Sequence, residues 1–189
     1  MPTLIIGLII FLGVHSISIV APAWRDQMAA RLGNRWRAVY SVVSLIGFIL
    51  IIKGYSIARL DPIVLYSPPL WLRHVTALLM ILVFPLLLAT YLPGRIKTLL
   101  KHPMLNAVKF WAIAHLLSNG TSNAVVLFGS FLLWAIADRI SVKRRPARPL
   151  LALPASKYND LIAIVGGLAL YFVTIHWLHY QLIGVVPLM

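Results

Sequence analysis

The sequence predicts an all-α integral membrane protein, a polytopic bundle of about six transmembrane helices, and three observations support this fold class. Hydrophobic residues make up 61% of the 189 residues, whereas charged residues make up only 11%. A soluble domain carries roughly 25% charged residues, so much of this surface is expected to face lipid. The apolar residues also fall into long runs, and most of the 17 lysines and arginines lie between those runs.

A transmembrane helix needs about 20 mostly apolar residues, and six runs approach or reach that length. The first carries no charge, the third contains Pro85, which is expected to kink it, and the fourth is the shortest. The six expected spans are residues 3–21, 38–58, 72–92, 104–118, 122–137 and 161–183. We expect a single domain over residues 1–189, with a basic, proline-rich cytoplasmic linker at about 139–159.

The placement of lysine and arginine predicts how the bundle is oriented. Thirteen of these residues lie in the first, third and fifth connections, and three (Lys53, Arg59 and Arg73) lie at the opposite ends of the spans. Cytoplasmic loops of membrane proteins are enriched in these cations, so both termini are expected on the non-cytoplasmic side. The alternation argues against a nucleic-acid partner, because such a protein gathers its cations on one water-facing surface.

Several kinds of chemistry are excluded by composition. The chain has no cysteine, which excludes disulfides, thiolate metal ligands and cysteine nucleophiles. It also has no glutamate, and its four aspartates (Asp26, Asp61, Asp138 and Asp160) lie near helix ends or in connections. Paired-carboxylate catalysis is therefore not expected, and no phosphate-binding or zinc-protease motif is present. The six histidines remain as the ionisable candidates for a functional site.

His15 and His115 lie well inside the first and fourth expected spans. Ionisable groups at such depth are costly in hydrocarbon and often mark a functional site. In the predicted orientation they lie roughly 9 and 16 Å from the cytoplasmic helix ends, at ~1.5 Å per residue. Two imidazoles at similar depth could be the axial ligands of a haem, with Phe11 and Trp111 on the adjoining helix faces. The alternative is that each histidine makes an interhelical hydrogen bond.

A second group of histidines lies toward the non-cytoplasmic side. His176 and His179 share a helix face, and together with His74 they are weaker candidates for a site that binds zinc or another metal. The alternative is that they are interfacial side chains in an aromatic belt.

Two further residues near His115 are candidates for cofactor binding. Lys109 could neutralise a haem propionate, although six residues separate it from His115 and place it on another helix face; alternatively its side chain reaches the cytoplasmic surface. Asn119 could orient His115 or line a pocket beside it.

These same residues resemble the NnrU family of bacterial membrane proteins, which also includes the plant zeta-carotene isomerases. The resemblance covers nearly the whole chain except the basic linker. The more specific parts are the His-Ser pair of the first span and the block that begins KHPM. The resembling stretches are GLIIFLGVHSISIV (7–20), YSVVSLIGFILIIKGY (40–55), PPLWLRHVTALLM (68–80), LPGRIKTLLKHPMLNAVKFWAIAHLLSNGT (92–121) and HYQLIGVVP (179–187).

The resemblance implies a bacterial inner-membrane protein that binds haem b through His15 and His115. Bacterial members are associated with denitrification, through the expression or maturation of nitrite and nitric oxide reductases. The plant relatives are haem b isomerases that act on carotenoids, so an apolar substrate and cis-trans isomerisation are also implied. The plant relatives have a cysteine three residues before the second histidine, where this chain has Ala112. A mechanism that exchanges histidine for cysteine is therefore not available here.

Two alternatives stay open beside the haem hypothesis. The protein could be a non-enzymatic accessory protein that holds a denitrification reductase or its maturation factor and binds no haem. The KHPM turn (residues 101–104) also resembles the Arg-His-Pro motif of membrane methyltransferases that act on lipids and isoprenylated cysteine. Those enzymes use acidic residues near the C-terminus, and this chain has no glutamate.

Overall fold

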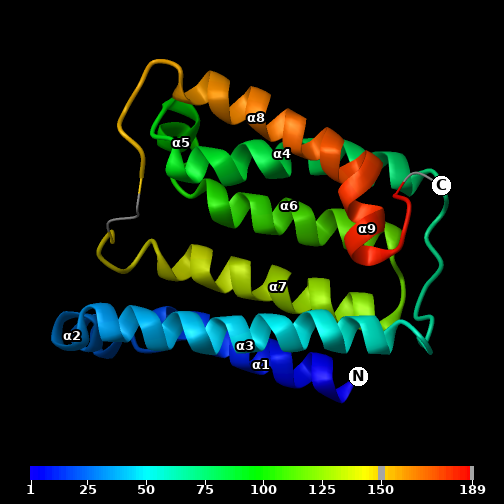
Figure 1. Cartoon of the computed structure of the whole chain (residues 1–189), viewed down its shortest axis with the longest axis horizontal. Helices are drawn as coiled ribbons and strands as arrows, with labels where there is room; N and C mark the ends of the chain where they lie inside the picture. Colours follow the sequence, from blue (N-terminus) through cyan, green and yellow to red (C-terminus); the bar gives the residue numbers. More distant parts are fainter. Residues whose placement is uncertain (149–151, 188–189) are drawn as a thin grey trace. The chain divides into compact units, whose positions relative to one another are not determined.

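The computed structural model describes residues 1–148 and 152–187, and within them the chain is helical (Figure 1). One isolated β-bridge joins Val64 and Thr121. Contacts divide the chain into two compact units: unit 1 comprises residues 1–65 and 121–146, and unit 2 comprises residues 66–120 and 147–189. The helices are α1 (Pro2–Val20), α2 (Pro22–Leu32), α3 (Asn34–Ala58), α4 (Leu72–Tyr91), α5 (Arg95–Leu100), α6 (Pro103–Ser118), α7 (Ser122–Ser141), α8 (Asn159–Val173), the π-helix η1 (Thr174–Leu178) and α9 (His179–Ile183).

The all-α fold is confirmed, and five of the six expected spans form helices long and apolar enough to cross a bilayer. They are α1, α3, α4, α7 and the continuous segment Asn159–Ile183. The fourth expected span forms α6, which has 16 residues and is shorter than the other five. The last span is one segment of three parts, α8, η1 and α9, because a π-helical turn interrupts its α-helical geometry.

The first cation-rich connection is not the loop that the sequence predicted. Residues 22–32 form α2, which starts with Pro22 in its first turn and continues through alanine, glutamine, methionine and arginine, all good helix formers. It ends at Gly33, whose φ of 51° is in the left-handed region that glycine tolerates. The start of the expected linker is also helical, because α7 continues to Ser141. Residues 149–151 of that linker lie outside the described residues.

In unit 1, α1 and α3 pack antiparallel at backbone contact. A Cβ atom on Gly54 would lie 2.3 Å from the backbone nitrogen of Leu4, and one on Gly47 would lie 2.7 Å from that of Phe11. On the other helix, a Cβ on Gly7 would lie 2.6 Å from the nitrogen of Ile51. Small residues permit this approach, and in lipid such van der Waals packing is a main source of helix association.

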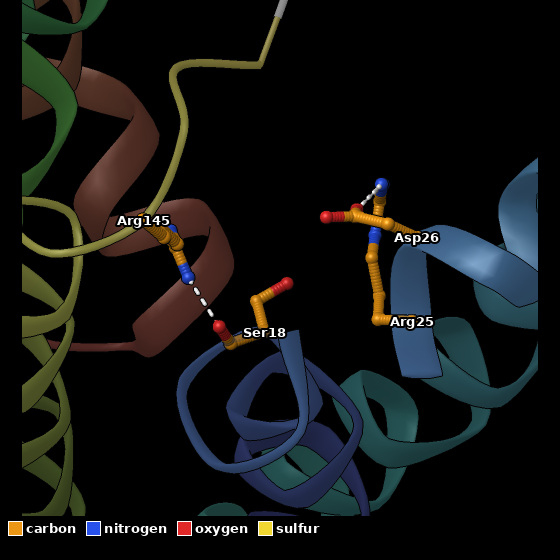
Figure 2. A network of polar contacts seen from close by, with 4 residues as sticks. All are labelled: Ser18, Arg25, Asp26 and Arg145. Carbon is orange, nitrogen blue, oxygen red and sulfur yellow. Dashed lines mark hydrogen bonds and ion pairs between the residues drawn. The ribbon is translucent and has the colours of Figure 1, made fainter. Parts of the chain in front are cut away.

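An ion pair joins the end of α7 to the connection that follows it. The guanidinium of Arg145 lies 2.8 Å from the carboxylate of Asp138, and these side chains are only 14% and 11% exposed. Arg145 also donates a hydrogen bond of 2.7 Å to the carbonyl of Ser18, near the end of α1, as Figure 2 shows. The same figure shows a second pair, Arg25 with Asp26, whose side chains are 30% and 44% exposed. Arg145 therefore fixes the end of α7 to the end of α1.

In unit 2, α6 and α8 both run antiparallel to α4 (Figure 1). The hydroxyl of Thr76, in the second turn of α4, donates to the carbonyl of Ala114, near the end of α6. The hydroxyl of Tyr171, near the end of α8, donates to the carbonyl of Ala77. At the other end of α4, the carboxylate of Asp160 accepts hydrogen bonds from the first two amides of α5 and so caps that helix.

The outward faces of the long helices are apolar. Large hydrophobic side chains are exposed along every one of them, whereas few are fully buried. Examples are Ile9 in α1, Leu45 in α3, Leu78 in α4, Leu133 in α7 and Leu170 in α8. Aligned apolar surface of this extent is compatible with contact to a lipid bilayer.

We predict that Gly54→Ala lowers the free energy of unfolding by about 1–3 kcal/mol, the usual effect of overpacking. The new methyl group would meet the backbone of α1, which cannot move aside without separating the two helices. Thermal or denaturant unfolding in detergent measures the change. Gly13→Ala is the matched control, because no atom lies within 4 Å of its Cβ position; it should be neutral or stabilising. Equal losses for both variants would contradict the packing argument.

We also predict that Arg145→Met costs about 3 kcal/mol of unfolding free energy, because it leaves the buried carboxylate of Asp138 without its counter-charge. Replacing Asp138 by Leu in the same chain should recover most of that loss. Arg25→Met, in the more exposed pair, should change the free energy by less than about 1 kcal/mol. A double variant as unstable as Arg145→Met would argue against the ion pair as the cause.

Candidate functional site: the helix-borne histidines

His15 lies among aromatic side chains from all three long helices of unit 1. Its ring stacks on Phe11 with a centroid separation of 4.3 Å, and it meets Tyr40 of α3 at 5.3 Å and Trp134 of α7 at 6.0 Å. Its Nδ1 lies 2.7 Å from the carbonyl oxygen of Phe11. A carbonyl only accepts, so Nδ1 must donate, and the neutral ring then carries its lone pair on Nε2. The ring is held in one tautomer and one orientation.

His115, in unit 2, makes the same kind of hydrogen bond from its ring to a backbone carbonyl. Its Nδ1 donates to the carbonyl of Trp111, one helical turn earlier, at 2.8 Å. The Trp111 ring lies 5.5 Å from the imidazole, centroid to centroid. The side-chain amide of Asn119 donates to the carbonyl of His115 at 2.9 Å. Asn119 therefore closes the end of α6 and contacts the backbone of His115.

A cavity of about 60 Å³ lies beside His115, within unit 2. Its walls come from the start of α4, the end of α6 and the end of the chain. Most of the lining is apolar, and the polar groups are few. The lining residues are Arg73, Thr76, Ala77, Met80, Phe84, His115, Tyr171, Thr174, Ile175, His179 and Pro187. His115 and His179 thus lie on one cavity, a pairing that sequence reasoning missed.

The π-helix η1 explains why His179 reaches this cavity. In a continuous α-helix, residues seven apart share a face, so Leu178 would lie below Tyr171. A π-turn holds one residue more than an α-turn and moves the following residues around the axis. The cavity is accordingly lined by Tyr171, Thr174, Ile175 and His179, but not by Leu178. Such turns are frequent at functional sites.

The group predicted from His74, His176 and His179 is not brought together around a cavity. His74 and His176 are exposed and do not line the cavity that holds His179. His176 stacks on Phe172 with an interplanar angle of 8°. Within the described ranges, 1–148 and 152–187, no cluster of three or more potential ligands could hold a metal ion.

Lys109 is half-buried on α6 and does not line the cavity beside His115. This agrees with the sequence argument that the two residues occupy different faces of the helix. Ala112, at the position of the relatives' cysteine, is fully buried at 0% exposure, so the helix is tightly packed there.

The residues around His15 and His115 fit haem ligation in three respects. Both histidines donate Nδ1–H to a backbone carbonyl, the support that metal-ligating histidines almost always have. Their neighbours Phe11 and Trp111 are aromatic and suit a porphyrin. In addition, two buried polar groups have no hydrogen-bond partner among the described residues. They are the indole Nε1 of Trp134 and the hydroxyl of Ser44. A bound molecule with acceptor atoms would satisfy such groups.

Fold and site together define a class: an all-helical protein with five helices of membrane-spanning length and histidines set within its apolar helices. The sequence pattern described as NnrU protein matches residues 3–187. The chain belongs to the NnrU family, and the matched range includes residues of both units. Neither the curated proteins nor the solved structures include a significant match to it.

Proposed function

We propose that this NnrU-family protein binds haem b in the bacterial inner membrane, with His15 and His115 as the axial ligands. The observation that carries the proposal is the shared state of the two rings, each with Nδ1 bound to the carbonyl of the preceding turn and its lone pair on Nε2. Two such imidazoles are the ligand set of a low-spin haem. Bound haem b would supply a one-electron redox centre or a Lewis-acidic iron.

We propose that this haem protein acts in denitrification, through the expression or maturation of nitrite and nitric oxide reductases, as the family resemblance implies. The related isomerase activity on an apolar polyene is the other enzymatic candidate. In either case the residues of this chain hold the group and exclude water from it, because aromatic and aliphatic side chains surround both imidazoles. We assign Lys109, the other ionisable residue on α6, to neutralise a propionate.

A second candidate function is that of a haem-free accessory protein, which holds a reductase or its maturation factor in the membrane. The observation that favours it is the packing of His15. Its ring already lies between Phe11, Tyr40 and Trp134, and such a ring could serve only to join three helices.

The proposed orientation has six crossings and both termini outside the cytoplasm. Although α6 is short, its contacts support a crossing: it begins beside the end of α4 and reaches back to Thr76, in the second turn of α4. The chain beyond it is held by the hydroxyl of Tyr66, which precedes α4 and donates to the carbonyls of Leu116 and Asn119. Thirteen of the 17 cations then face the cytoplasm.

We predict that the protein, purified in detergent from haem-replete cells, shows a Soret band and sharp low-spin bands on reduction. His15→Ala and His115→Ala should each lower the haem-to-protein ratio at least about tenfold, since losing a ligand costs no less than losing its support. His74→Ala is the control, because that side chain is exposed. A preparation that stays colourless after haem is added would favour the accessory function instead.

The orientation is testable by cysteine labelling. The natural chain has no cysteine, so all labelling of a variant comes from its single introduced cysteine. Gln27, Ser67 and Ala155 are exposed positions in three different connections. With six crossings, a membrane-impermeant maleimide added to spheroplasts should label Ser67→Cys, and should label Gln27→Cys and Ala155→Cys only after permeabilisation. Labelling of Ala155→Cys from outside would show that α6 does not cross.

A further inference from the structure

We propose that α2 and the start of α3 form a surface that binds the headgroups of anionic phospholipids through Arg31, Arg35 and Arg37. All three side chains are exposed. The surface lies within unit 1, and the proposal rests neither on haem binding nor on the number of crossings.

The position of α2 places these arginines at the membrane surface. The helix connects the end of α1, at Val20, to the start of α3, at Asn34, and both of those helices are long and apolar enough to span a bilayer. With 11 residues, α2 is only about 16 Å long and too short to cross the hydrocarbon core itself. Figure 1 shows it beside the end of α1 and the start of α3.

A contact between two tryptophans holds α2 against α3. The ring of Trp24 meets that of Trp36 edge-on, with the centroids 5.7 Å apart. Trp36 is the third residue of α3, and Gly33 joins α2 to that helix, so both ends of α2 lie near the start of α3. Trp24 is 49% exposed, and tryptophan prefers the headgroup level of a membrane. The pair indicates that α2 lies along the interface instead of projecting into water.

The positive charge of this surface is not balanced by the chain itself. Arg25 is paired with Asp26. Arg31, Arg35 and Arg37 have no carboxylate partner among the residues that the structure describes. An anionic lipid surface would supply the missing negative charge, and each cation close to it strengthens the attraction.

The choice of residue favours phosphate as the anion. The segment 24–37 contains four arginines and no lysine. Lysine and arginine orient a membrane protein equally well, so orientation alone does not explain this composition. A guanidinium group can donate two parallel hydrogen bonds to a phosphate, which an ammonium group cannot. In a zwitterionic headgroup the amine beside the phosphate would be repelled by the same arginines, so a headgroup without an amine should bind better.

An exposed apolar strip on α3 continues from Arg35 and suits an acyl chain. Val39, Val42 and Ile46 lie four, seven and eleven residues after Arg35, which places them on the same face of the helix. Their exposed fractions are 58%, 56% and 48%. A lipid whose phosphate contacts Arg35 can therefore lay its acyl chain along this strip. The order of charged and apolar groups matches the order of groups in a phospholipid.

Native mass spectrometry of the full chain in a non-ionic detergent tests the proposal. The delipidated protein is titrated with phosphatidylglycerol, or with phosphatidylcholine that has the same acyl chains. We expect a dissociation constant at least about fivefold lower for phosphatidylglycerol, the effect of one cation near an anionic surface. A triple variant with Arg31→Gln, Arg35→Gln and Arg37→Gln should lose this preference. Added salt should reduce it, because exposed charges are screened.

Lys53→Gln is the matched control for the single variant Arg35→Gln. It removes one exposed cation from the same helix, about 27 Å further along α3. Arg35→Gln should weaken phosphatidylglycerol binding about fivefold, whereas Lys53→Gln should leave the preference unchanged. Equal binding of the two lipids by the natural chain, or equal losses in the two single variants, would overturn the proposal. Circular dichroism and the melting temperature check that each variant keeps its fold.

Discussion

Backbone carbonyls accept the hydrogen bonds of the histidines, threonines and tyrosine that hold the long helices together, and the rest of the structure depends on this constraint. In hydrocarbon no water is available to a buried hydroxyl or imidazole, and an unpaired group costs several kcal/mol, on the order of 2–7. Thr90 donates within its own helix, to Leu86, whereas Thr76 and Tyr171 donate across helices. A hydrogen bond within one helix satisfies the side chain without linking that helix to a neighbour. The second type sets the register of α4 against its two neighbours.

The same constraint fixes the chemical state of the histidines. A carbonyl one turn earlier takes the Nδ1 hydrogen of His15 and of His115, so the second nitrogen of each ring becomes the acceptor. Helix geometry offers the acceptor, because a carbonyl lies four residues before every helical position, and the orientation of each of these two rings uses it. His179 reaches the same state in a different way, through the carbonyl of Val185 beyond its helix. The three neutral rings therefore share one tautomer, with the hydrogen on Nδ1 and the lone pair on Nε2.

The sequence was sufficient to predict what depends on composition and long periodic runs. The positions of the long helices, the placement of His15 and His115 inside apolar helices and their aromatic neighbours all follow from the apolar pattern. The helix α2 was missed because its residues have no apolar periodicity, although their helix propensity is high. The pairing of His179 with His115 was missed because regular spacing assigns His179 to the face of His176. One extra residue in the π-turn changes that face, and the regular spacing of apolar residues does not reveal it.

The shortage of carboxylates explains why function should depend on imidazoles. Asp138 is paired with Arg145, Asp26 with Arg25, and Asp160 caps α5, while Asp61 is exposed. A site that holds a cation must therefore use neutral ligands, and its charge must be balanced by an anion brought in with it. Haem, the group proposed for His15 and His115, would meet this requirement with its own porphyrin and propionate charges.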